Sequence, residues 1–213
     1  MLSSEEMIYS DEEVAQLPSI SRKHPFYAKW KTRQHSTSRL IKQVQLNRYP
    51  LNILEVGCYN GWLAAKLANV TSGNVTGINC NTKELLQARR IFGTVTNLEF
   101  IATNILHASL RDKKFDFIVF ASSIQFFPSL EDVIKNTMGH LTLKGQIHIL
   151  DSPLYPANEF LKSHQDNINY YIHHLSDLEA FQHKIIYDPG AWNNKLFAKR
   201  DPCYHIVIKN PYH

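Results

Sequence analysis

Cysteine is scarce in this 213-residue chain, and its three cysteines, Cys58, Cys80 and Cys203, are widely spaced. This spacing excludes a disulfide framework and any Cys-x-x-Cys metal knuckle. Long hydrophobic runs are also missing, since the longest strongly apolar stretch, residues 115–121, is far too short to span a bilayer. The first eleven residues contain three acids and no apolar segment, so they do not resemble a secretory signal. We therefore expect a cytoplasmic protein that does not enter a membrane.

Charge is modest overall, with a formal net charge of +4, but it is unevenly distributed. Residues 5–13 contain five acids and no base, whereas residues 22–48 contain eight lysines and arginines and no acid. Such a basic block can face nucleic acid, an acidic substrate or the chain's own acidic leader, or it can form a solvated helix face. No signature of a nucleic-acid-binding fold accompanies it, so we favour the solvated face and do not expect a nucleic-acid substrate.

Short apolar runs alternate with helical patterns through the middle of the chain. Strands are predicted at 52–57, 74–79, 98–102, 115–121 and 146–150. Helices are predicted at 62–70, after an N-cap at Asn81 with Glu84 in the capping-box position, and at 130–141. Strands separated by helices form βαβ units, which give a parallel sheet covered on both faces.

The alternation ends after residue 150. A loop is predicted around Pro153 and Pro156, followed by a polar and aromatic helix from about Leu161 to Phe181. Residues 183–187 and 204–209 are predicted strands without a helix between them, so they should pair antiparallel. The whole pattern predicts one α/β sheet of seven strands that is mostly parallel.

Residues 53–62, I-L-E-V-G-C-Y-N-G-W, resemble the first motif of class I S-adenosylmethionine-dependent methyltransferases, a strand followed by E-x-G-x-G-x-G. The likeness continues in V-T-G-I-N at 75–79, F-D-F-I-V-F-A-S-S at 115–123 and L-T-L-K-G-Q-I-H-I at 141–149. It implies a Rossmann-like fold with an antiparallel last strand, the cofactor S-adenosylmethionine, and methyl transfer to a small organic acceptor. The G-x-G-x-x-G pattern of dinucleotide sites is absent at 57–62, so a nicotinamide or nucleotide-sugar enzyme is the least favoured alternative.

Ligands of open α/β sheets bind at the carboxyl ends of the strands. The turn after the first strand needs residues without bulk at Gly57 and Gly61, and the dipole of the following helix favours a carboxylate. The resemblance assigns the methionine end of the cofactor to this turn, with Glu55 near its positive end. The residues expected to bind the cofactor are Glu55, Gly57, Cys58, Tyr59, Gly61, Trp62, Asn79, Cys80, Asn104, Ile105 and Ser122. An ordinary core position is an equal alternative for Cys80 and Ile105.

Three residues of this site depart from the family's pattern. Tyr59 replaces the middle glycine and narrows the backbone conformations open to the turn. Asn79 stands where relatives carry a carboxylate that accepts from both ribose hydroxyls, and Asn104 where an Asp accepts from the adenine amino group. An amide oxygen accepts such bonds without the added strength of a carboxylate. We therefore expect weaker cofactor binding, and a catalytically weak cofactor-binding module is the main alternative.

Methyl transfer requires alignment of the acceptor and exclusion of water, with a general base only for a protonated acceptor. The acceptor is expected beyond the fourth and fifth strands, which makes Gln125, Asp151 and Tyr155 candidate contacts and His174 a candidate base. A capping or packing role is the alternative for each. Neighbouring histidines on a helix point about 100° apart, and no Asp or Cys completes a ligand set, so no metal site is expected.

Residues 1–48 are predicted to form a helical, basic segment that covers the cofactor site of a methyltransferase domain at 49–213. Tyr27 and Trp30 supply apolar anchors there, and Arg33 lies three residues further on. We expect these residues to help to close the site, with an arginine near the methionine carboxylate. The sequence indicates no particular oligomeric state.

Overall fold

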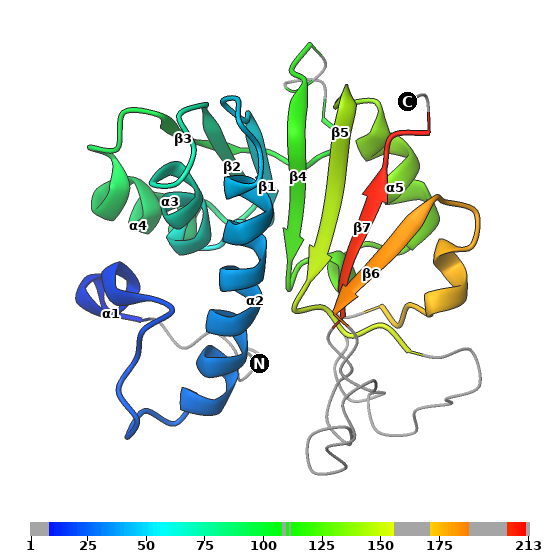
Figure 1. Cartoon of the computed structure of the whole chain (residues 1–213). Coiled ribbons are helices and arrows are strands. Elements are labelled where there is room, and N and C mark those ends of the chain that lie inside the picture. Colours follow the sequence, from blue (N-terminus) through cyan, green and yellow to red (C-terminus); the bar gives the residue numbers. More distant parts are fainter. Residues whose placement is uncertain (1–8, 108–109, 111, 156–170, 188–203, 212–213) are drawn as a thin grey trace.

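The computed structural model describes residues 9–107, 110, 112–155, 171–187 and 204–211, and these contain one seven-stranded sheet of order β3-β2-β1-β4-β5-β7-β6 (Figure 1). The strands are β1 (Ile53–Val56), β2 (Val75–Asn79), β3 (Leu98–Ala102), β4 (Phe115–Ala121), β5 (Leu141–Leu150), β6 (His183–Tyr187) and β7 (His205–Lys209). Strands β1 to β5 pair in parallel, whereas β7 pairs antiparallel with β5 and β6. The predicted sheet is confirmed.

Strand β1 lies between β2 and β4, and all four of its residues are buried. Such continuous burial is typical of a parallel strand covered on both faces. Strand β5 begins at Leu141, five residues before the predicted start at Gln146, and its register against β4 shifts between Phe115 and Phe117. The polar residues before Gln146 therefore belong to an irregular extension of the strand.

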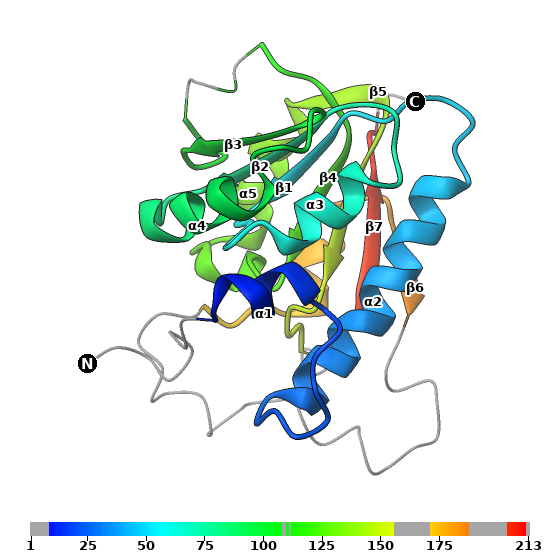
Figure 2. The ribbon, with the colours of Figure 1, turned by 90° about the vertical axis from the view of Figure 1, so that its left-hand side faces the viewer.

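Helices cover both faces of the sheet (Figure 2). One core packs α2 (Tyr27–Gln45), α3 (Trp62–Ala68) and α4 (Thr82–Phe92) against the sheet. The other packs α5 (Leu130–Met138) and the 3-10 turn η3 (Leu175–Leu178) against the opposite face. Among the described residues, no helix combines the length and apolar character needed to cross a bilayer.

Helix α4 begins as predicted, because the Asn81 side chain accepts hydrogen bonds from the backbone N–H groups of Lys83 and Glu84. The reciprocal half of the predicted capping box is replaced by another contact. The backbone N–H of Asn81 donates to Asn79 Oδ1 at 3.3 Å, while Asn79 Nδ2 donates to Glu84 Oε2 at 2.6 Å. Glu84 is thus bound to the end of β2.

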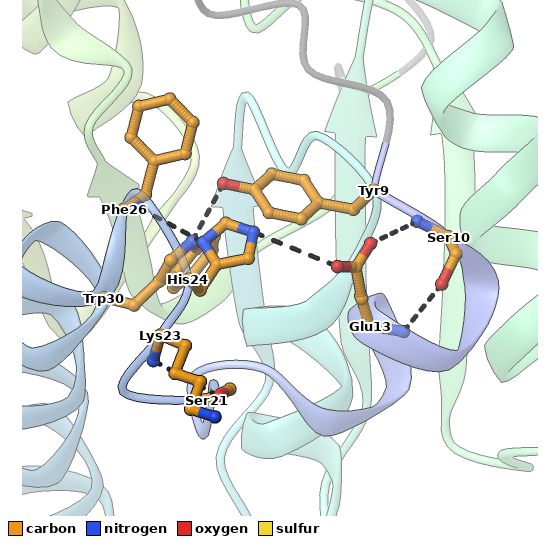
Figure 3. A network of polar contacts seen from close by, with 8 residues as sticks. All are labelled: Tyr9, Ser10, Glu13, Ser21, Lys23, His24, Phe26 and Trp30. Carbon is orange, nitrogen blue, oxygen red and sulfur yellow. Dashed lines mark hydrogen bonds and ion pairs between the residues drawn. The ribbon is translucent and has the colours of Figure 1, made fainter.

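Polar and aromatic contacts within the segment before β1 hold its parts together (Figure 3). In this network Trp30 Nε1 donates to the hydroxyl of Tyr9 at 2.9 Å, and the Tyr9 ring stacks on His24. Trp30 also meets Trp62 of α3 edge-on, with ring centroids 5.3 Å apart. Helix α1 (Asp11–Gln16) is held to α4 by the ion pair of Asp11 with Arg90. Residues of this segment therefore belong to the same core as the sheet.

The predicted helix at 161–181 is wrong over its described part, and residues 161–170 lie outside the described residues. Residues 171–174 are extended, and helical structure is limited to the 3-10 turn η3. The backbone groups pair with neighbouring loops instead: the N–H of Tyr171 donates to the carbonyl of Gln125, and that of Leu175 to the carbonyl of Tyr155, both at 2.8 Å. These long-range bonds outweigh the local helical pattern.

A buried histidine pair lies on the face that α2 covers. His148 of β5 and His205 of β7 are fully buried, with Nδ1 of the first 3.2 Å from Nε2 of the second. Burial lowers the pKa of His148 to about 3, and the charge of His205 adds to this effect. Burial and the charge of Arg39 lower the pKa of His205 to about 4. Both rings are therefore neutral at physiological pH.

Replacing both rings, His148→Leu with His205→Val, is expected to change how stability depends on pH. An unfolded histidine binds a proton near pH 6.5, whereas the folded pair resists protonation until the pH is near 4 or below. The wild type should therefore lose stability relative to the double variant as the pH falls below about 6.5, by up to about 1.4 kcal/mol per pH unit for each histidine.

Urea unfolding of both proteins between about pH 8 and pH 4.5 measures this difference. The comparison cancels the contributions of the titrating groups that the two proteins share. A stability difference that stays constant over this range would contradict the burial of two neutral rings.

Candidate functional site

The turn between β1 and α3 is formed by residues in left-handed backbone conformations. Gly57 and Gly61 have φ values of 73° and 76°, and Tyr59 between them has φ 48°. A Cβ on Gly57 would lie 2.7 Å from Cβ of Ser123, and one on Gly61 would lie 2.5 Å from the ring of Phe100. Backbone conformation and close packing therefore require both glycines, in addition to any approach of a ligand. Cys58 and Trp62 are buried in the adjoining core.

Glu55 is a buried carboxyl group beside this turn, with 2% of its surface exposed. Burial raises its pKa to about 8, against the opposing effects of a hydrogen bond from the backbone N–H of Ala64 and of the charge of Arg33. Ala64 lies in the first turn of α3. The carboxyl group that binds the backbone N–H at the start of this helix is therefore that of Glu55, a residue of the chain itself. Its Oε2 is buried and has no hydrogen-bond partner among the described residues. Such an atom is suited to a bound cation.

Three non-glycine residues with positive φ stand at the carboxyl ends of β1, β4 and β5. Tyr59, Ser122 and Asp151 have φ values of 48°, 58° and 54°. The Tyr59 hydroxyl donates to the carbonyl of Ser122 at 2.9 Å, which joins the first two strand ends. Strained backbone costs on the order of 1–3 kcal/mol per residue and clusters at functional sites. This cluster marks the edge of the sheet where the sequence predicts the site.

Helix α2 binds two of these strained residues. Its Arg33 donates to Oγ of Ser122 at 3.0 Å, and Ser36 donates to Oδ2 of Asp151 at 2.7 Å. Burial raises the pKa of Asp151, while the charges of Arg33 and Arg39 and the bond from Ser36 oppose that rise. Sequence reasoning selected Arg33 and missed Ser36, because a serine inside a basic helix has no distinguishing signal.

The other two anchors predicted on α2 have different surroundings. Trp30 is only 2% exposed and belongs to the core, and its ring lies 4.9 Å from the guanidinium carbon of Arg33. Tyr27 is half-buried in the first turn of the helix. Trp30 therefore positions Arg33 by a cation–π contact.

The predicted acceptor residues Gln125, Asp151 and Tyr155 follow β4 and β5, and Tyr155 is in direct contact with His174. Gln125 is buried, its Nε2 donates to the carbonyl of Ser122 at 2.8 Å, and its Oε1 is buried without a partner in the described part of the chain. Tyr155 is 3% exposed and forms a β-bridge with His174. His173, which we did not select, is more buried than His174, and burial lowers its pKa. In this segment the N–H of Tyr171 donates to the carbonyl of Gln125, and His173 lies against the backbone of Ile124 and Phe127.

The residues predicted around the ribose and adenine follow β2 and β3. The amide of Asn79 is bonded to Glu84 and to the backbone of Asn81. Asn104 is exposed, and its Oδ1 accepts from the N–H of Leu106 at 2.8 Å. Cys80 is exposed as well, whereas Ile105 is 1% exposed and packs in the second core.

The sequence family described as a methyltransferase domain matches residues 53–145. The methyltransferase phqN of Penicillium fellutanum is 32% identical over 84 residues, which are 38% of this chain and 26% of that protein. The chain therefore spans about a quarter of the length of this curated relative.

Solved structures share the fold at low sequence identity. The [4+2]-cyclase SpnF superposes with a TM-score of 0.67 at 16% identity, covering 94% of this chain and 91% of that chain. Magnesium protoporphyrin IX methyltransferase from Synechocystis PCC 6803, solved with S-adenosylhomocysteine, gives 0.66 at 12% identity, covering 93% and 94%. The YcgJ protein of Bacillus subtilis gives 0.65 at 14% identity, covering 82% and 96%.

The methyltransferase-domain match, the strand order of the sheet and the turn formed by Gly57 and Gly61 all indicate the same fold. Residues 53–145 therefore match a methyltransferase domain, and the chain shares the fold of solved methyltransferases.

Gly57→Ala is expected to destabilise the fold by about 2–4 kcal/mol, because the new methyl group meets Ser123 and the residue must keep a positive φ. Gly139→Ala is the matched control, since Gly139 caps α5 at φ −59° and its Cβ would lie 3.3 Å from the nearest atom. Urea unfolding should show a loss below about 1 kcal/mol for this control. Equal losses of stability in the two variants would contradict the close packing of Gly57 against Ser123.

Proposed function

We propose that this protein transfers the methyl group of S-adenosylmethionine to a small organic acceptor at the carboxyl edge of β1, β4 and β5. The observation that carries the proposal is the set of strained residues Tyr59, Ser122 and Asp151 at three strand ends. Tyr59 bonds to Ser122, and α2 bonds to both Ser122 and Asp151. Backbone strain of this kind persists only where surrounding contacts hold it, and it is typical of active sites.

The charges at this edge fit the methionine end of the cofactor. The unpartnered Oε2 of Glu55 is suited to an ammonium group, and Arg33 to a carboxylate. The cofactor supplies a methyl group that its sulfonium already activates. The protein's task is then to orient the acceptor and keep water away.

Gln125 and Asp151 are the proposed acceptor contacts. Gln125 offers a buried Oε1, which accepts a hydrogen bond from a hydroxyl or amine. The raised pKa of Asp151 suits it to receive a proton if the acceptor carries one. Tyr155 and His174 form the adjoining wall through their β-bridge.

We further propose that residues 1–48 cover the site, as the sequence predicts. Support comes from Arg33 and Ser36, whose side chains bind Ser122 and Asp151 directly. Helix α2 also extends past the strand ends at its N-terminal end (Figure 1). Since this segment contributes Trp30 and Leu40 to the core, its deletion would unfold the domain, and point variants are the appropriate test.

The second candidate function is a cofactor-binding module with little catalysis. It is favoured by the departures at Tyr59, Asn79 and Asn104, and by the engagement of Asn104 Oδ1 in its own turn. The [4+2]-cyclase with the same fold is a reminder that a fold does not determine a reaction. Turnover to S-adenosylhomocysteine in the presence of candidate acceptors distinguishes the two functions.

Calorimetric titration with S-adenosylhomocysteine is expected to give micromolar binding, with none for NAD. Arg33→Gln should weaken binding by about tenfold, because it removes a charge-assisted contact to the carboxylate. Lys31→Gln, an exposed position on the same helix, is the matched control and should bind as the wild type does. Absence of binding to the wild type would overturn the proposal.

Binding should also release a proton near pH 7. Glu55 is largely protonated in the free protein because its pKa is about 8, and an adjacent ammonium group favours the carboxylate. Titrations in two buffers of different ionisation enthalpy measure the release, which Glu55→Gln should abolish. Glu12→Gln, at an exposed position, should retain it. A wild type that releases no proton would contradict the assigned role of Glu55.

A further inference from the structure

The outer face of α2 is an exposed stripe that extends over most of the helix. Successive helical residues are turned by about 100°, so positions three and four apart share one face. The residues at this spacing, all of them exposed, are Lys31, His35, Ser38, Lys42 and Leu46. The opposite side of the helix is buried in the core. Figure 2 shows α2 at the outside of the molecule, so the stripe faces solvent.

Five exposed bases lie on this stripe or in the chain close to its ends, and none forms an ion pair within the described ranges. They are Arg22, Lys23, Lys31, Lys42 and Arg48. The stretch between Glu13 and Glu55 contains no acid. Arg33 and Arg39 act instead on the buried groups beneath the helix. The outer face therefore carries positive charge with no acid beside it in the chain.

The acidic leader is one candidate partner for these bases, but its described contacts lie elsewhere. Asp11 pairs with Arg90 of α4. Glu13 accepts from the backbone N–H of Ser10 at 2.8 Å, and its other oxygen lies 3.9 Å from Nε2 of His24 (Figure 3). The contacts of these two carboxylates do not support pairing of the leader with the outer face of α2.

Large apolar side chains are exposed at the C-terminal end of the stripe, among the bases. Leu46 is 75% exposed and Tyr49 is 50% exposed, and they follow Lys42 and flank Arg48 in the chain. Nucleic-acid phosphates are bound by basic and hydroxyl groups and offer nothing to an exposed leucine. A lipid surface offers anionic headgroups to the bases and hydrocarbon to the apolar side chains. The combination therefore favours a lipid surface.

We propose that the outer face of α2 binds an anionic lipid surface, with Lys31, Lys42 and Arg48 at the headgroups and Leu46 and Tyr49 at the boundary of the acyl chains. Basic clusters on a helix are typical of proteins that bind anionic lipids. The helix lies in the plane of the surface, and the binding is peripheral and reversible. Arg33 and Ser36 point to the other side of α2 and keep their bonds to the strand ends.

Co-sedimentation of the full chain with lipid vesicles, without cofactor, tests the proposal. The wild type should bind vesicles of equal parts phosphatidylserine and phosphatidylcholine, and should not bind vesicles of phosphatidylcholine alone. Added salt should weaken binding, because it screens exposed charges. Lys31→Gln combined with Lys42→Gln should weaken binding by about 20-fold, since each basic residue at an anionic surface contributes about fivefold.

Leu46→Ser tests the apolar part of the surface. It should weaken binding by about fivefold at every salt concentration, because salt does not screen an apolar contact. The lysine variant should instead reduce the salt dependence. Lys83→Gln combined with Lys135→Gln removes the same charge from exposed positions of α4 and α5, and should bind as the wild type does. Thermal unfolding of every variant checks that the fold is retained.

Three results would each overturn the proposal: no binding to the anionic vesicles, equal binding to both kinds of vesicle, or an equal loss of binding in the control variant. Binding to duplex DNA without binding to anionic vesicles would assign this face to nucleic acid instead. The vesicle measurements contain no S-adenosylhomocysteine, so their outcome leaves the proposed function to its own tests.

Discussion

The inner side of the turn that joins β1 to α3 has no room for a side chain, and the carboxyl edge of the sheet is arranged around this restriction. Ser123 closes the turn from β4, with its Oγ donating to the carbonyl of Val56 at 2.6 Å, and Phe100 closes it from β3. Because the turn lies this deep, Glu55 reaches the first turn of α3 and the Tyr59 hydroxyl reaches Ser122. The geometry of the candidate site therefore follows from the packing of the central strands.

Helix α2 supplies the charges that this edge requires. Glu55 is buried and Asp151 is half-buried, and a carboxyl group removed from water without polar contacts is costly. Arg33 faces both groups, and Ser36 donates directly to Asp151. The basic block noted in the sequence is thus more than a solvated helix face, because part of it turns inward. The same helix buries Trp30 in the core, so it joins the stability of the fold to the electrostatics of the site.

Most of the fold was predictable from local patterns. The strands and the helices up to Leu150 follow from the spacing of apolar residues and from caps such as Asn81, because these signals act over a few residues. The two last strands were predictable as well, but the course of residues 171–178 was not, since its backbone pairs with Gln125 and Tyr155 rather than with itself. Long-range pairing of this kind leaves no periodic trace in the sequence.

The site was predictable only where a motif describes it. The glycine turn and Glu55 follow from the motif at 53–62, whereas the bond of Ser36 to Asp151 joins residues 115 positions apart. The link between Asn79 and Glu84 is short in sequence, yet it was obscured by a competing local role for Glu84. Left-handed conformations at Ser122 and Asp151 also have no signature, since neither residue is glycine.

The three left-handed, non-glycine residues at the strand ends lower the stability of the protein. At Tyr59, Ser122 and Asp151 a glycine would adopt the same backbone without strain, and would relieve roughly 1–2 kcal/mol at each position. The chain instead keeps a phenol, a hydroxyl and a carboxyl group at these strand ends. Stability is given up there in exchange for side-chain chemistry, the trade-off expected where selection acts on activity. Variants chosen only for thermostability would tend to lose these three side chains first.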